Sequence, residues 1–215
     1  MKLRQKDLAN LRAAIDLIGQ GATKVEFSSI DPPMILTHKE HFGEIEAINV
    51  ITPEQVYNDE RYAHLKSSIN RFLRKNPFEN NVFIMMRFYD DIDIFKNIEK
   101  EIKDTLSENG LVGHLAKDRR YKRDMLDNIK VYMASCRYGI AVFEMIRDTD
   151  FNPNISIEFG YMEAWGRNVL LLKEQNLPNL HTDIVGELYE EFNQDRLSTI
   201  RSCIRRWIRD LGHTS

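Results

Sequence analysis

From residue 81 onward, short apolar runs of strand length alternate with longer segments whose apolar residues recur every three or four positions. Runs of the first kind are typical of buried strands, and spacing of the second kind is typical of amphipathic helices. The predicted strands are residues 82–86, 111–115, 138–143 and 168–172, with an edge strand at 189–192. The predicted helices are residues 92–106, 125–134, 154–164 and 196–211, with a short helical segment at 182–188. This alternation implies right-handed crossovers, and therefore an α/β fold with a mostly parallel sheet covered by helices on both faces.

The first 75 residues follow a different pattern. A helix is predicted at 6–18, and strand candidates at 25–30, 34–36 and 44–51 favour a small antiparallel sheet. A second helix is predicted to begin at Thr52-Pro53-Glu54-Gln55, a capping-box pattern, and to continue to about residue 73 with a break near residues 58–59. The turn-rich segment 75–80 then suggests a domain boundary. We therefore expect a small α+β appendage at residues 1–75 and an α/β domain at residues 80–215.

Composition narrows the class of protein. Hydrophobic residues make up 42% of the chain and charged residues 29%, as in ordinary folded proteins. The longest apolar runs are too short to span a bilayer, and no apolar segment follows the charged N-terminus, so a cytoplasmic location without a secretory signal is expected. Cys136, Cys203 and the six histidines show no metal-ligand spacing and no disulfide framework, so no metal is expected.

The formal net charge of −3 argues against general binding to nucleic acid, although basic residues cluster locally. The C-terminal cluster consists of Arg201, Arg205, Arg206 and Arg209. These four mostly share one face of the predicted closing helix, opposite its apolar stripe. A solvated face is the first interpretation of such a pattern, and a phosphate or partner-protein site is the alternative.

Candidate chemistry gathers where the predicted strands end. If the second strand lies beside the first and the first beside the third, the strand order reverses between the first and third strands. Their carboxyl ends carry Met86, Arg87 and Phe88 in one case and Glu144 in the other. Glu158 follows on the next helix, beside an apolar stripe and near the positive end of the helix, where an open α/β sheet places its chemistry.

That helix has clear predicted ends. Asn152 is a cap residue, Pro153 suits the first helical position, and Gly166 is a natural stop. Glu158 can also serve a plainer purpose, by favouring the N-terminal turns of the helix or by pairing with an arginine.

Other residues around this edge have two interpretations each. Arg87 can bind a phosphate or a ribose hydroxyl, or it can pair with Asp90 or Asp91. Asp118 and Arg119 follow the second strand, where phosphate contact competes with a solvated loop.

Three further candidates are uncharged. Asn154 can hydrogen-bond substrate hydroxyls or cap the helix. Phe88 and Tyr161 can stack on a base or simply pack against neighbouring side chains.

Four segments occur in one order: VFIMMRF at 82–88, RYGIAVFE at 137–144, NPNISIEFGY at 152–161 and GRNVLLL at 166–172. That order resembles the nucleoside 2-deoxyribosyltransferase-like proteins and the related bacterial TIR-like domains, over about residues 80–192. The resemblance implies a flavodoxin-like three-layer sandwich with its catalytic glutamate on the helix after the third strand, which is Glu158 here. It also implies cleavage of an N-glycosidic bond in a nucleotide-type substrate. NAD(+) hydrolysis stands ahead of base exchange on nucleosides, with NAD as substrate and no cofactor.

The resemblance further implies a bacterial defence or toxin-like role, with residues 1–75 sensing a signal or holding a homo-oligomer together. One departure concerns Met85-Met86-Arg87-Phe88, which stands where the deoxyribosyltransferases have a small, glycine-containing loop. The bulkier loop indicates a different substrate or a narrower pocket. Two alternatives remain open: a nucleotide-binding sensor module without turnover, and a TIR-like scaffold that assembles filaments.

Overall fold

The computed structural model describes residues 24–27, 34–37, 50–89, 91–147, 152–178 and 189–212, the first two segments by their backbone alone. The chain divides into two compact units, Met1–Ile48 and Asn49–Ser215. In the first unit, β1 (Lys24–Phe27) and β2 (Met34–Thr37) pair antiparallel, as predicted for these two strands. The predicted helix at 6–18 and most of the predicted strand at 44–51 lie outside the described residues.

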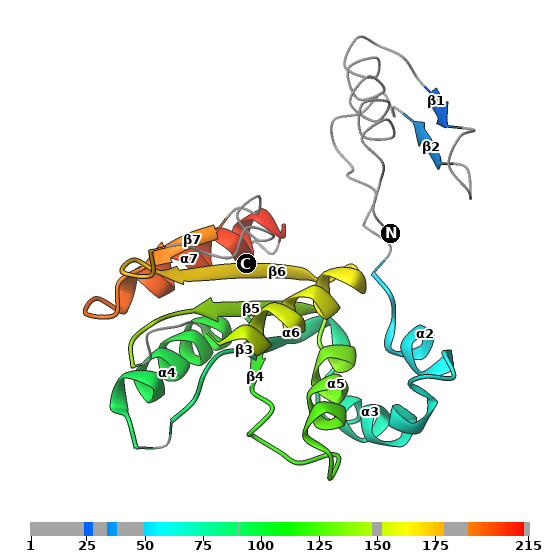
Figure 1. Ribbon diagram of the computed structural model, residues 1–215, viewed down its shortest axis with the longest axis horizontal. Helices are drawn as coiled ribbons and strands as arrows, with labels where there is room; N and C mark the ends of the chain where they lie inside the picture. Colours follow the sequence, from blue (N-terminus) through cyan, green and yellow to red (C-terminus); the bar gives the residue numbers. More distant parts are fainter. Residues whose placement is uncertain are drawn as a thin grey trace. The chain divides into compact units, whose positions relative to one another are not determined.

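The second unit is built on a five-stranded parallel sheet with the order β4-β3-β5-β6-β7 (Figure 1). Its strands are β3 (Asn81–Met85), β4 (Val112–His114), β5 (Tyr138–Phe143), β6 (Asn168–Glu174) and β7 (Tyr189–Phe192). All five were predicted, with ends that differ by a residue or two. The order is the flavodoxin-like one, in which the chain runs outward from β3 in one direction and then in the other.

Helices cover both faces of this sheet. They are α2 (Pro53–Asn58), α3 (Lys66–Leu73), α4 (Asp93–Glu108), α5 (Met125–Ser135), α6 (Pro153–Ala164) and α7 (Ser198–Asp210), with short 3₁₀ turns at Ala63–Leu65 and Phe78–Asn80. Side chains alternate along each strand, so one face packs against α3, α5 and α6 through Phe83, Met85, Ala141, Phe143 and Leu171. The other face packs against α4 and α7 through Val82, Ile84, Ile140, Val142 and Leu172. The α/β sandwich is therefore three-layered.

The structure moves the domain boundary toward the N-terminus. Residues 50–73 were predicted to belong to the appendage, but they are part of the second unit. Leu65, Ile69 and Phe72 form an apolar stripe that is buried in the same core as Phe83 and Tyr132. A short helix of this kind gains its stability from burying such a stripe, and here the stripe packs against α5.

The local signals in this segment were read correctly. Thr52 and Gln55 form the capping box, with hydrogen bonds in both directions between side chain and backbone. The predicted break falls between α2 and α3.

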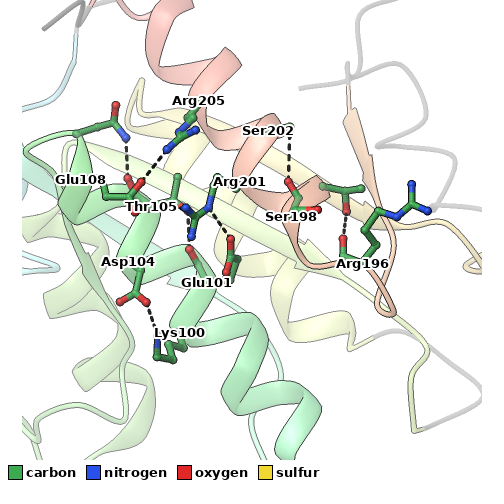
Figure 2. A network of polar contacts seen from close by, with 12 residues as sticks. Lys100, Glu101, Asp104, Thr105, Glu108, Arg196, Ser198, Arg201, Ser202 and Arg205 are labelled. Atoms are coloured by element: carbon green, nitrogen blue, oxygen red, sulfur yellow. Dashed lines mark hydrogen bonds and ion pairs between the residues drawn. The ribbon is translucent and has the colours of Figure 1, made fainter.

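The arginines of the basic cluster on α7 chiefly form ion pairs with acidic residues of the same domain. Figure 2 shows Arg201 and Arg205 reaching across to the carboxylates of α4. Arg201 Nε lies 2.8 Å from Glu101 Oε1, and Arg205 Nη2 lies 2.9 Å from Glu108 Oε2. These pairs join the two helices of one layer, which leaves less reason to assign the cluster to a phosphate or partner site. In the described part of the chain, no helix combines the length and apolar character needed to cross a bilayer.

Candidate functional site at the carboxyl edge of the sheet

The strand order reverses at β3, whose two neighbours in the sheet are β4 and β5. The segments that leave β3 and β5 at their carboxyl ends meet through one ion pair, in which Arg87 Nε lies 3.6 Å from Glu144 Oε1. Both side chains are poorly exposed, Arg87 at 13% and Glu144 at 2%. The other carboxylate oxygen of Glu144 accepts a hydrogen bond from the Ile146 N–H at 2.8 Å. The structure thus brings Arg87 and Glu144 together at the switch point, where open α/β sheets place ligands.

Glu158 is held in place by α6, whose two ends are fixed by local sequence. At the N-terminus, Asn152 Oδ1 accepts a hydrogen bond from the Asn154 N–H at 3.1 Å, and Pro153 occupies the first helical position. At the C-terminus, Gly166 has φ +66° and closes a Schellman motif, because Gly166 N–H bonds to the Glu163 carbonyl and Arg167 N–H to the Met162 carbonyl, both at 2.9 Å. Both predicted ends of this helix are confirmed.

Glu158 lies in the second turn of α6, next to Phe159 and one turn after Ile155, both buried. Within the described residues its carboxylate has no hydrogen bond and no ion pair. Burial raises the pKa of Glu158 from its usual 4.5 to about 7, because removal of water disfavours the charged form. A carboxylate that is desolvated and has no compensating cation interacts strongly with any positive charge that develops beside it.

Asp118 and Arg119 form hydrogen bonds that stabilise the loop after β4. Asp118 Oδ2 accepts a hydrogen bond from the Leu115 N–H at 2.9 Å and pairs with Lys103 Nζ of α4 at 3.0 Å. The Tyr132 hydroxyl forms two hydrogen bonds with the backbone of Arg119. It accepts from the Arg119 N–H and donates to the Arg119 carbonyl, both at 2.9 Å. Asp118 is therefore engaged in holding the loop, and its predicted substrate contact remains a prediction.

Two residues that shape this loop were missed by the sequence analysis. Besides Tyr132, Asn128 of α5 accepts from Tyr121 N–H at 2.6 Å and donates to the Ala116 carbonyl at 2.9 Å. Polar residues at inward positions of a helix were the available signal, since buried polar groups are almost always hydrogen-bonded.

The remaining candidates are spread over different surroundings. Met86 is only 7% exposed and belongs to the core under α4. Phe88 is 45% exposed, with Lys117 Nζ 5.4 Å from its ring centroid. Asn154 is exposed, and the capping role considered for it is filled by Asn152.

Tyr161 lies in a separate cavity, not beside the ion pair of the switch point. It packs edge-on against Trp165, with ring centroids 5.9 Å apart, near the C-terminal end of α6. The cavity there has a volume of about 330 Å³ and is lined neither by Arg87 nor by Glu144 nor by Glu158. The position of Tyr161 therefore does not favour stacking on a substrate at the switch point.

Metal ligation and thiolate chemistry were also considered for the described residues. No group of three or more His, Cys, Asp or Glu side chains is arranged there to hold a metal ion. Cys136 is fully buried, and burial raises the pKa of its thiol far above the usual value, which disfavours a thiolate nucleophile.

Comparison with known proteins gives only distant likenesses. No protein-family model matches the chain, and no curated protein matches it. One similar solved structure is a 2-desoxiribosyltransferase from Leishmania mexicana, with TM-score 0.37 and 16% identity over 44% of this chain and 64% of that chain. Another is a flavo di-iron protein from Thermotoga maritima, with TM-score 0.41 and 12% identity over 70% of this chain and 41% of that chain. This chain thus covers less than two thirds of the length of each protein.

Proposed function

We propose that the protein cleaves an N-glycosidic bond in a nucleotide-type substrate, with NAD(+) hydrolysis as the first reaction to test. The observation that carries the proposal is Glu158, a desolvated carboxylate with pKa about 7 and no partner among the described residues. It lies on the helix that follows β5, and the sequence resemblance assigns the catalytic glutamate to that helix. A role in bacterial defence belongs to the same proposal.

The chemistry of the bond explains why one carboxylate is enough. When the bond from the anomeric carbon to the nicotinamide nitrogen breaks, both electrons go to the ring, which leaves as a neutral molecule. The ribosyl group is left with positive charge, which a nearby carboxylate stabilises. Water then adds to the anomeric carbon and loses a proton. The leaving group needs no proton of its own, so Glu158 acts in its ionised form.

Desolvation makes this stabilisation selective for the transition state. In water a carboxylate is already solvated and gains little from a new cation, whereas a buried one gains much more. The cost of burying the charge is present before substrate binds and is relieved as the ribosyl cation forms. Binding energy of that kind lowers the barrier instead of merely tightening the ground-state complex.

Base exchange on a nucleoside is a second candidate, and the same pKa favours it for a different reason. At neutral pH a carboxyl group with pKa about 7 is protonated in about half of the molecules, so it can also donate a proton to a departing base. The two reactions then differ in their dependence on pH. Cleavage of NAD(+) should fall as Glu158 becomes protonated, and acid-assisted departure of a base should fall as Glu158 loses its proton.

The test is incubation of the purified protein with NAD(+), nucleosides and nucleoside monophosphates, with base release followed by chromatography. Glu158→Gln keeps the shape of the side chain and removes its charge. We expect a loss of turnover on the order of a thousandfold, because several kcal/mol of transition-state stabilisation are removed, with little change in substrate binding. A folded Glu158→Gln protein with undiminished base release would remove Glu158 from the mechanism. Nucleotide binding by the wild type without any base release would favour a sensor module instead.

A further inference from the structure

The cavity beside the C-terminal end of α6 has a composition that the proposed reaction does not use. Its walls combine three aromatic rings with one pair of opposite charges. The residues that matter here are Tyr62, Tyr161, Trp165, Asp59 and Arg61. A volume of about 330 Å³ is in the range of small-molecule sites.

Trp165 meets each of the two tyrosine rings edge-on. Tyr62 meets Trp165 with centroids 5.6 Å apart and an interplanar angle of 88°. Tyr161 meets the same indole at 5.9 Å and 68°. A planar base is best sandwiched between parallel rings, whereas rings set nearly at right angles surround a compact, rounded group. Ring faces carry partial negative charge, so the rounded group that such walls favour is a cation.

The rim of the cavity already holds a cation of the protein's own. The guanidinium carbon of Arg61 lies 5.6 Å from the centroid of the Tyr62 ring. The same guanidinium pairs with Asp59, with Nε 3.0 Å from Oδ1 and Nη2 2.5 Å from Oδ2. The Arg61 side chain is 77% exposed, so it can leave this position at small cost. The Arg61 guanidinium therefore occupies a position in which an external cation would contact both the Tyr62 ring and the Asp59 carboxylate.

We propose that this cavity binds a compact organic cation of the quaternary ammonium or methylated amine class. The ligand displaces the Arg61 guanidinium, places its alkylated nitrogen against Tyr62, Tyr161 and Trp165, and takes over Asp59 as counter-charge. The site is distinct from Glu158, although α6 carries both Glu158 and Tyr161 and is directly followed by Trp165.

The experiment titrates the protein with choline and, separately, with its uncharged isostere dimethylbutanol, in which carbon replaces the quaternary nitrogen. Proton–nitrogen NMR of the indole N–H groups reports on the site, because the chain has only two tryptophans. Trp207 is the internal control: its Nε1–H donates to Asn168 Oδ1 at 2.6 Å, and it packs on the opposite face of the sheet. We expect choline to shift the Trp165 signal and not the Trp207 signal, with dimethylbutanol roughly tenfold weaker.

Three variants sharpen the test. Asp59→Asn should weaken choline binding several-fold by removing the counter-charge. Arg61→Ala should strengthen it, because the internal competitor is gone. Tyr62→Leu should weaken it while keeping an apolar wall, and thermal melting of each variant checks that it folds. Glu158→Gln should leave choline affinity unchanged, which separates this site from the proposed catalytic one.

Several results would overturn the proposal. Equal affinity for choline and dimethylbutanol would make the cavity an apolar one without preference for charge. Weaker choline binding by Arg61→Ala, or a Trp165 shift caused by inorganic phosphate and lost in Arg61→Ala, would mean an anion site. A Trp165 signal that stays still up to tens of millimolar choline would mean that no such ligand binds.

Discussion

Glu158→Gln should make the protein more stable at alkaline pH, and this effect tests the environment of Glu158 without reference to any substrate. The pKa of Glu158 is about 7 in the folded protein against a usual 4.5. A raised carboxyl pKa means that the folded protein stabilises the neutral form of the carboxyl group relative to the charged form. The free energy of unfolding contributed by this group is therefore intact below about pH 4.5 and is lost as pH rises through about 7. The shift corresponds to roughly 3 kcal/mol, since one pKa unit is about 1.4 kcal/mol.

Glutamine does not titrate, so the variant escapes this loss. We expect Glu158→Gln and wild type to unfold at similar denaturant concentrations near about pH 4.5, and the variant to be more stable by roughly 3 kcal/mol near about pH 8. In thermal melting this corresponds to an upward shift of roughly 6–12 °C at the higher pH.

Glu60→Gln is the matched control for this experiment. It makes the same substitution at an exposed carboxylate for which the structure gives no side-chain contact among the described residues, so it controls for the substitution itself. A stability difference between Glu158→Gln and wild type that is constant across this range, or a variant that is less stable at alkaline pH, would mean that the carboxylate has a stabilising partner. The argument from desolvation would then be wrong.

Three other outcomes follow from the same structure. If the ionised form of Glu158 acts on NAD(+), kcat/KM should rise about tenfold per pH unit below about 7 and level off above it, and a profile that falls over this range would favour acid-assisted base departure. Burial lowers the pKa of His114 from 6.5 to about 4, so the unfolding free energy should drop as pH falls through this window. His114→Gln, which can still donate to Asn81, should remove most of that drop in denaturant titrations at several pH values, and an unchanged drop would place its origin elsewhere. Arg87→Met should lower the unfolding free energy by roughly 3 kcal/mol, because it removes a cation 3.6 Å from the buried Glu144 carboxylate, and adding Glu144→Gln should recover most of the loss. Equal stability of Arg87→Met and wild type would show that the pair carries little energy.

The sequence predicted the α/β unit well because its local signals and its long-range packing agree. Tyr138–Phe143 is buried along its whole length, so a continuous apolar run identifies it without knowledge of its neighbours. The ends of α6 depend on Asn152, Pro153 and Gly166, whose backbone preferences act within a turn of the chain. Parallel pairing then follows from the length of the connections, since α4, α5 and α6 lie in the successive crossovers from β3 to β6.

The domain boundary and the surroundings of the site depend on contacts between segments that are far apart in the sequence, and the local sequence pattern does not indicate such contacts. Nothing in the segment 66–73 itself says that Phe72 packs against Tyr132 of α5. The sequence offered Asp90 or Asp91 as partners of Arg87, and Asp90 lies outside the described residues. The structure adds Glu144, which directly follows the neighbouring strand β5. Tyr161 lies one helical turn from Glu158, yet it lines a cavity with Tyr62, which is far away in sequence. In each case the local sequence predicts the helix or strand that carries the residue, but the residue's contacts are known only from the fold.

The two glutamates of the carboxyl edge differ in a way that sequence order alone does not reveal. Glu144 has a cation beside it and a backbone N–H on its second oxygen, so its negative charge is already compensated. Glu158 is desolvated, and no compensating group exists for it among the described residues. When two carboxylates have such unequal environments, they are suited to different tasks. The compensated one fixes the geometry of the switch point, and the uncompensated one is left to respond to charge that arrives with a substrate or develops during a reaction. If the roles were reversed, Glu144→Gln would abolish turnover while Glu158→Gln would chiefly unsettle the fold, and comparing rate and stability for the two variants decides between these assignments.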